Sequence, residues 1–319
     1  TSPPPTAGSL VQAKVVANWD GLLRAPFCRD FCFDETRAVS GGGGVVRARM
    51  LLTELAVVRA AHLVLASASP RRVQILNEQL GLNTVVMPSF FEENLEKSQY
   101  TPHEYVRENA LQKALEVYNR LSEDDRPPSC VIGADTVVVL GEEVLEKPKD
   151  KADAAKMLAR LSAAGSHTVC TGVALVYCDN KERVDDDAND GLPVIVNSFV
   201  ETTQVSFAVL SPELIEAYVE TGEPLDKAGA YGIQGLGGSF VTGIQGDYLN
   251  VVGFPMHRFC AELDVAHLAE WSRTQLEIGA WESRANPNEH SGGPAEATDA
   301  VVAAVSSKCP DDECGLPSD

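Results

Sequence analysis

Short apolar runs alternate with amphipathic segments from residue 61 to about residue 264, and this order of signals constrains the fold most. The run at residues 131–140 is rich in Val and is typical of a buried strand. Further strands are predicted at residues 63–66, 84–87, 168–177, 200–210 and 250–254. Helices are predicted at residues 71–80, 101–121, 151–161, from 211 onward and at 255–263. Strands and helices in mixed order predict one α/β domain of about 200 residues.

Helix-starting patterns support several of these helices. Ser69 followed by Pro70 fits an N-cap and a first helical position. Thr101, Pro102 and Glu104 have the spacing of a capping box. Ser211 before Pro212 starts a helix by the same logic.

The segments outside residues 61–264 lack this periodicity. Residues 1–60 contain three consecutive prolines and a run of four glycines, and they predict a poorly ordered N-terminal extension. Residues 265–319 are polar and acidic, which predicts a disordered tail. An acidic stretch at residues 179–197 is expected to be a solvated loop between two strands.

Composition excludes some classes of partner. A net charge of −20 disfavours a nucleic-acid binder, and no apolar run reaches the length of a membrane span. The eight cysteines form no CxxC pair, and Cys170 and Cys178 lie in apolar runs, where reduced thiols are expected. The first residues do not resemble a signal peptide. We expect a cytoplasmic protein that binds neither nucleic acid nor a membrane.

The corner Ser-Ala-Ser-Pro-Arg-Arg at residues 67–72 joins a predicted strand to a predicted helix. A helix N-terminus attracts anions, and Arg71 and Arg72 add fixed positive charge. This pattern suits phosphate. The alternative is a capped helix with solvated arginines, and the residues alone leave both interpretations open.

Asp135 is a carboxylate inside the apolar run at residues 131–140. Burying an unpaired charge is costly, so metal coordination or proton transfer would explain it. A strand-end Asp bonded to backbone amides is the alternative. Glu93 follows a predicted strand, where an α/β site would place a second carboxylate for Mg²⁺, although a charged loop face fits equally.

Other candidates are weaker when taken alone. Lys147 precedes Pro148, which stiffens the backbone and could direct the ammonium toward phosphate. Lys113 alone would be assigned to a helix surface, and His167 at a strand entry favours a structural role. Gln234 lies in a Gly-rich loop, and its amide could pair with a base edge. Together these features indicate a nucleotide site suited to metal-assisted phosphoanhydride hydrolysis.

Several ordered motifs resemble the Maf family of nucleoside triphosphate pyrophosphatases. They lie at residues 67–72, 133–136 (Gly-Ala-Asp-Thr), 145–148 (Leu-Glu-Lys-Pro), 223–235 and 252–255 (Val-Gly-Phe-Pro), in register from about residue 62 to 263. The resemblance implies an elongated α/β fold like that of inosine triphosphate pyrophosphatases, with a central mixed sheet and a cleft between two lobes. It also implies Mg²⁺ or Mn²⁺ as cofactor and a homodimer, and it makes residues 61–264 the Maf-like domain.

The resemblance assigns roles to single residues. Asp135 matches the general base, and Glu93 and Asp135 match acidic positions for the metal. The residues that match groups around the triphosphate are Ser67, Arg71, Arg72, Lys113 and Lys147.

Three positions bear on the substrate. Arg71, Thr136 and Gln234 are similar to the branch of the family that acts on dTTP and UTP. The branch that acts on 7-methylated GTP has an aromatic, a Gln and a Glu there. The expected reaction is hydrolysis of a pyrimidine nucleoside triphosphate to monophosphate and pyrophosphate. The alternatives are a non-catalytic nucleotide-binding or regulatory module with the same fold, and an enzyme that removes modified purine triphosphates.

The end of the domain and the acidic tail also resemble a vertebrate protein whose Maf-like portion precedes a methyltransferase domain. No such domain is recognisable in these 319 residues, so we expect no methylation by this chain.

Overall fold

The computed structural model describes residues 54–122, 127–178 and 194–274. Most of the predicted N-terminal extension, most of the acidic stretch at residues 179–197, and the tail beyond residue 274 lie outside these ranges.

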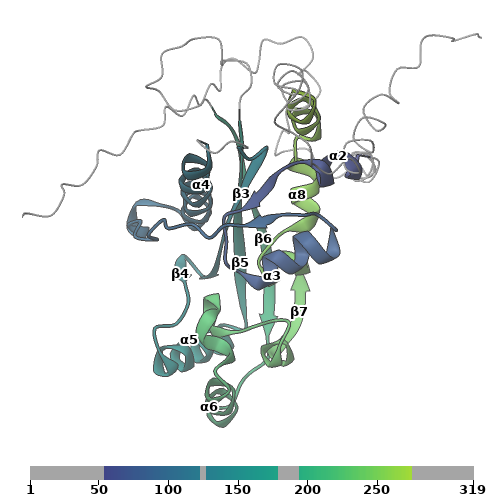
Figure 1. Ribbon diagram of the computed structural model, residues 1–319. Helices are drawn as coiled ribbons and strands as arrows, with labels where there is room; N and C mark the ends of the chain where they lie inside the picture. The colour runs from purple at the N-terminus through teal and green to yellow at the C-terminus, as the bar shows by residue number, and fades with distance from the viewer. Residues whose placement is uncertain (1–53, 123–126, 179–193, 275–319) are drawn as a thin grey trace, which may run out of the picture.

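A seven-stranded mixed sheet forms the centre of the fold (Figure 1). The strands are β1 (Leu63–Leu65), β2 (Val85–Val86), β3 (Cys130–Leu140), β4 (Glu143–Leu145), β5 (Ser166–Cys178), β6 (Val194–Phe207) and β7 (Val241–Gln245). Their order is β2-β1-β3-β5-β6-β7, with β4 paired to β3. β1 is parallel to β2 and β3, and the other pairs are antiparallel. The predicted mixed α/β architecture is confirmed.

The long strands β3, β5 and β6 run along the length of the molecule and give it an elongated shape (Figure 1). Different hydrophobic clusters form around the two ends of these strands. One contains Leu63, Leu76, Phe254 and Leu268, near β1 and the C-terminal helices. The other packs α5 and α6 against the opposite end, at Val138, Val169 and Val205.

Helices cover this sheet. They are α2 (Leu55–Ala60), α3 (Pro70–Val73), a π-helix η1 (Gln74–Gln79), α4 (Pro102–Leu121), α5 (Lys151–Ala164), α6 (Pro212–Glu220), α7 (Tyr248–Val252), α8 (Met256–Glu262) and a helix at residues 265–274. Short 3₁₀ turns are η2 (Lys97–Gln99), η4 (Glu223–Asp226), η5 (Ala228–Ala230) and η6 (Leu236–Phe240).

Local capping explains where the longer helices begin. The predicted capping box of α4 is present, because Thr101 Oγ1 accepts from the Glu104 amide and the Glu104 carboxylate accepts from the Thr101 amide. Ser211 caps α6 through the Leu214 amide. Ser69 occupies the N-cap position of α3, but its side chain makes no capping hydrogen bond. The predicted single α-helix over 71–80 is instead a short α-helix continued by η1.

Two glycines allow α4 to lie directly on the sheet. A Cβ added at Gly133 of β3 would lie 2.0 Å from the Ala110 carbonyl oxygen. A Cβ at Gly172 of β5 would lie 2.4 Å from the Val106 carbonyl oxygen. The helix backbone therefore occupies the space of these absent side chains, and the polar side chains of α4 reach the middle of β3.

The strand predicted at residues 250–254 is wrong. Asp247 caps a helix there through the Leu249 amide, so residues Tyr248–Val252 form α7, and Gly253 at φ 127° ends it. Asn250 is buried and its amide donates to the Val169 carbonyl and to Thr203 Oγ1. The periodicity of a short apolar run does not distinguish a strand from a buried helix. Here the Asp247 cap favours the helix.

Helical structure continues beyond both limits predicted for the Maf-like domain at residues 61–264. Residues 265–274 are helical, and Leu268 and Trp271 have exposed fractions of 0% and 3%. At the other end, α2 precedes residue 61 and buries Val58. The folded region thus extends beyond both predicted limits.

None of the helices in the described ranges combines the length and the apolar character needed to cross a membrane. Within those ranges Cys130, Cys170, Cys178 and Cys260 carry free thiols. The first three are buried, as predicted for Cys170 and Cys178.

Candidate active site

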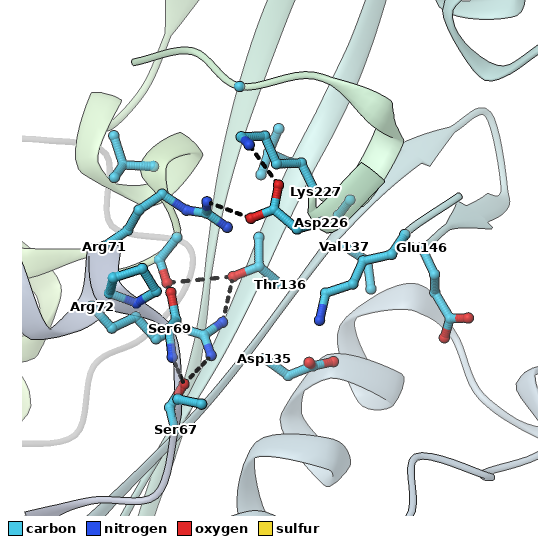
Figure 2. Close-up of a pocket in the computed structure, with 18 of the residues that line it drawn as sticks. Ser67, Ser69, Arg71, Arg72, Asp135, Thr136, Val137, Glu146, Asp226 and Lys227 are labelled. Carbon is cyan, nitrogen blue, oxygen red and sulfur yellow. Dashed lines mark hydrogen bonds and ion pairs between the residues drawn. The ribbon is translucent and has the colours of Figure 1, made fainter. Parts of the chain in front are cut away.

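All the side chains predicted for the site lie around one cavity of about 830 Å³. They are Ser67, Arg71, Arg72, Glu93, Lys113, Asp135, Thr136, Lys147 and Gln234. The cavity has the size of a small-molecule site. Its walls come from the β1–α3 corner, the middle of β3, the end of β4 and the glycine-rich loop after α6 (Figure 2).

Asp135 sits midway along β3, opposite Gly172 of β5, with an exposed fraction of 7%. Its Oδ1 lies 2.8 Å from Lys113 Nζ, and its Oδ2 accepts from Asn109 Nδ2 at 3.3 Å. Lys113 and Asn109 are four residues apart, so they share one face of α4. The interpretation of Asp135 as a strand-end Asp bonded to backbone amides does not match these partners.

Lys113 joins two carboxylates, because its ammonium also lies 2.9 Å from Glu93 Oε1. The lysine side chain is only 11% exposed, in contrast to the surface position expected for it alone. Asn109 was not singled out in the sequence, since an Asn within a helix carries no distinctive signal.

Arg72 is buried and its guanidinium contacts protein on several sides. It donates to the Gly253 carbonyl (3.0 Å), the Ala134 carbonyl (2.9 Å), Ser67 Oγ (3.0 Å) and Thr136 Oγ1 (3.0 Å). These bonds occupy four of its five N–H groups. Burial lowers the pKa of the guanidinium from its usual value. Arg72 therefore joins the corner at residues 67–72 to β3. Its contact with phosphate remains a prediction.

Ser67 has the same connecting role. It is 8% exposed, and its hydroxyl oxygen accepts from the Ser69 amide as well as from Arg72 (Figure 2). The hydrogen bond from the Ser69 amide to Ser67 Oγ, rather than a cap by the Ser69 side chain, stabilises the turn into α3.

Arg71 points across the cavity. Its Nη1 lies 3.4 Å from Asp226 Oδ2, and the other Asp226 oxygen accepts from Lys227 Nζ at 2.6 Å (Figure 2). Partial burial acts to raise the pKa of Asp226, but Lys227 and Arg71 outweigh it and lower that pKa below its usual value. Arg71 is 29% exposed, so it remains accessible to a ligand.

Thr136 follows Asp135 and its hydroxyl is already used. It accepts from Arg72 and lies 3.0 Å from Thr171 Oγ1, which itself donates to the Asn250 carbonyl. Because the Thr171 hydroxyl donates its proton to the Asn250 carbonyl, the Thr136 hydroxyl is the donor in the bond between the two threonines.

Lys147 and Glu146 line the cavity at the end of β4. Glu146 accepts from Tyr105 Oη at 2.6 Å and pairs with Lys97 at 2.8 Å. Among the described residues Lys147 makes no hydrogen bond or ion pair, so its ammonium is available to a ligand. Both side chains follow directly on the strand β4, which pairs with β3.

His167 is structural in this arrangement, as its sequence context favoured. It is buried, its Nε2 lies 2.8 Å from Tyr231 Oη, and burial lowers the pKa of the imidazole to about 4.

Residues 62–266 match the Maf-like protein family. The chain belongs to this family. A probable bifunctional dTTP/UTP pyrophosphatase/methyltransferase protein from Homo sapiens is 53% identical to it over 204 residues. That match covers 63% of this chain and 31% of the human protein, so the chain spans about a third of that relative.

Two bacterial relatives match over nearly their whole length. A dTTP/UTP pyrophosphatase of Clostridium perfringens is 43% identical over 63% of this chain and 95% of its own length. A dTTP/UTP pyrophosphatase of Symbiobacterium thermophilum is 46% identical over 62% of this chain and 90% of its own length. Residues 62–266, which match the Maf-like family, contain all seven strands of the sheet and the residues that line the cavity.

Proposed function

We propose that this chain hydrolyses dTTP and UTP to the nucleoside monophosphate and pyrophosphate. The observation that carries the proposal is Asp135, a carboxylate held in the middle of a buried strand and facing a cavity lined by cationic side chains. The bacterial relatives named dTTP/UTP pyrophosphatases support it, because they match this chain over almost their full length.

The reaction needs a base, a water molecule and a neutralised phosphate chain. Asp135 takes a proton from the water, whose oxygen forms a new bond to the α-phosphorus. The bond between the α-phosphorus and the bridging oxygen to the β-phosphorus breaks, and pyrophosphate leaves. Arg71 and Lys147 bind the phosphates and stabilise the charge that develops on them. Arg72 keeps the corner in place through its protein contacts.

The donor chemistry of the carboxylates fits a divalent cation. Mg²⁺ is commonly bound by one or two protein carboxylates together with substrate phosphates. Glu93 and Asp135 supply two carboxylates on either side of Lys113. Within the described ranges no group of three or more His, Cys, Asp or Glu side chains could hold a metal alone, so phosphate oxygens would complete the shell. Bound Mg²⁺ or Mn²⁺ would neutralise phosphate charge.

The preference for pyrimidines rests on Arg71, Thr136 and Gln234, which line the same cavity. Gln234 is exposed within the glycine-rich loop, and its amide offers both a donor and an acceptor to a base edge. A base whose edge does not complement that amide would leave polar groups unpaired, which lowers its affinity.

A pyrophosphate-release assay over dTTP, UTP, GTP and modified GTP, with and without Mg²⁺, tests the proposal. We expect release from dTTP and UTP that depends on the metal. Release from the guanine nucleotides alone would overturn the pyrimidine assignment. Binding of dTTP without release would instead indicate a non-catalytic nucleotide-binding module.

We also propose a cytoplasmic location and a homodimer. Free buried thiols suit a reducing compartment. Cell fractionation and light scattering of the purified chain would test these two points, and a secreted protein or a monomer would contradict them.

A further inference from the structure

The turn from Gly232 to Gly235, which carries Gln234, is held from behind by a carboxylate that the proposed reaction does not use. The turn is closed by a hydrogen bond from the Gly235 amide to the Gly232 carbonyl at 3.2 Å. Gln234 faces outward from it and is exposed. A turn this short needs contacts from other segments to keep one conformation.

Glu223 supplies those contacts on one side. Its Oε2 accepts from the Leu236 amide at 2.9 Å, and its Oε1 accepts from the Gly237 amide at 3.1 Å. Partial burial acts to raise the pKa of Glu223, but these backbone hydrogen bonds outweigh it and hold the pKa below its usual value. A charged acceptor bonded to two backbone amides makes hydrogen bonds stronger than neutral ones.

Tyr218 extends the contact to the start of the turn. Its hydroxyl donates to Glu223 Oε1 at 2.9 Å and accepts from the Gly232 amide at 3.1 Å. The tyrosine has an exposed fraction of 4%, and its ring packs edge-on against Phe240 with centroids 4.8 Å apart. The hydroxyl is therefore fixed by packing, and it links the carboxylate to the turn.

The glycines of the turn leave room for this carboxylate. A Cβ at Gly235 would lie 2.5 Å from Glu223 Oε1, and a Cβ at Gly232 would lie 3.1 Å from the same atom. The chain thus wraps around the Glu223 side chain. The backbone of Glu223 is tied in turn to the cavity wall, because Lys227 Nζ bonds both the Glu223 carbonyl and Asp226.

We propose that Glu223 and Tyr218 are positioning residues that set base selectivity by fixing the turn on which Gln234 lies. The proposal rests on the proposed pyrophosphatase activity and deepens it. Neither side chain has to touch the reacting phosphates, so their loss affects the discrimination between bases more than the chemical step.

Glu223→Gln and Tyr218→Phe test the proposal in the full chain. In Glu223→Gln, the side-chain NH₂ group would replace the oxygen that accepts from the Leu236 amide. In Tyr218→Phe, the Gly232 amide would lose the hydroxyl that accepts its hydrogen bond. We expect the ratio of kcat/KM for UTP to that for GTP to fall about tenfold in each variant. The kcat for UTP should change less than about threefold, with the loss appearing in KM.

Two exposed residues provide matched controls for these variants. Glu216 lies on α6 and is exposed, and Tyr248 has an exposed fraction of 45%. Glu216→Gln and Tyr248→Phe should keep the wild-type ratio of kcat/KM for UTP to that for GTP.

A double variant separates positioning from a general loss of structure. In a Gln234→Ala background, Glu223→Gln should change the ratio less than about twofold, because the residue through which it acts is absent. An equal loss in both backgrounds would overturn the proposal. A kcat that falls for UTP and GTP alike, with the ratio unchanged, would also overturn it. If Glu223→Gln fails to fold, Tyr218→Phe in the two backgrounds gives the same test. A wild-type chain that releases no pyrophosphate would refute the proposed function instead.

Discussion

Arg71 and Arg72 are neighbours in the sequence but have different surroundings in the fold. Arg72 is buried and bonded to two carbonyls and two hydroxyls, whereas Arg71 faces the cavity and a single exposed carboxylate. The sequence suggested one shared role as a pair of phosphate ligands. The structure divides the pair into one residue that organises the corner and one that is free to meet a ligand.

Arg72→Lys should therefore destabilise the protein strongly, whereas Arg71→Lys should not. A lysine cannot replace the guanidinium fork, and each buried carbonyl left without a partner costs about 1–3 kcal/mol. We expect the free energy of unfolding in urea to fall by about 2–4 kcal/mol for Arg72→Lys and by less than about 1 kcal/mol for Arg71→Lys. Equal losses in the two variants would show that Arg72 is not the organising residue.

Which residues gather at the cavity could be predicted from the sequence, but their partners could not. Asp135 carries a distinctive local signal, a carboxylate in an apolar run, whereas Lys147 and Gln234 gained their roles from the ordered motifs that resemble the Maf family. Asn109 and Asp226 gain their roles only when α4 and η4 come next to Asp135 and Arg71. Contacts between segments so far apart in the chain leave no local pattern to read.

Helices and strands that carry a local sequence signal were predicted correctly more often than those that depend on tertiary contacts. The helices α4 and α6 begin with side-chain caps, and the sequence showed these caps directly. β4 and β7 were not predicted, because no continuous apolar run marks them in the sequence and they gain stability from pairing with β3 and β6. The close approach of α4 to the sheet follows from Gly133 and Gly172, whose importance depends on the tertiary arrangement.

Gly133→Ala tests this approach. The new methyl group would lie 2.0 Å from the Ala110 carbonyl oxygen, so α4 would have to move away and would carry Lys113 with it. We expect the free energy of unfolding to fall by about 2–4 kcal/mol, together with the rate of pyrophosphate release.

Gly243→Ala is the matched control for that change. Nothing lies within 4 Å of a Cβ at Gly243 in β7, so its stability should stay within about 0.5 kcal/mol of wild type. A Gly133→Ala protein as stable as this control would contradict the close packing of α4.

For the whole molecule, the sheet and the cavity were predictable but the limits of the fold were not. The helix at residues 265–274 has mixed polarity, so its sequence did not indicate that Leu268 and Trp271 would be buried. Leu268 joins the cluster around β1, and Trp271 joins the cluster beneath α4. Residues beyond the predicted boundary therefore contribute to the core.

Trp271→Ala should lower the free energy of unfolding if the helix at residues 265–274 contributes to the core. Truncating a buried Trp removes about 3–5 kcal/mol of stability, and Trp271 is 3% exposed. Glu270→Ala, at the exposed neighbouring position, should cost less than about 0.5 kcal/mol. Urea denaturation of both variants checks this, and equal stability would mean that the domain ends before residue 265.

The role of Asp135 is tested most directly by pyrophosphate release from saturating dTTP and UTP by the wild type and by Asp135→Asn. The amide keeps the size of the side chain but cannot accept the proton of the attacking water. We predict wild-type release of pyrophosphate and a loss on the order of 10²–10⁴ in kcat for Asp135→Asn, the usual scale for a general base. Glu216→Gln, which changes a carboxylate outside the cavity, should retain wild-type kcat. Turnover by Asp135→Asn close to that of the wild type would show that Asp135 is not the general base.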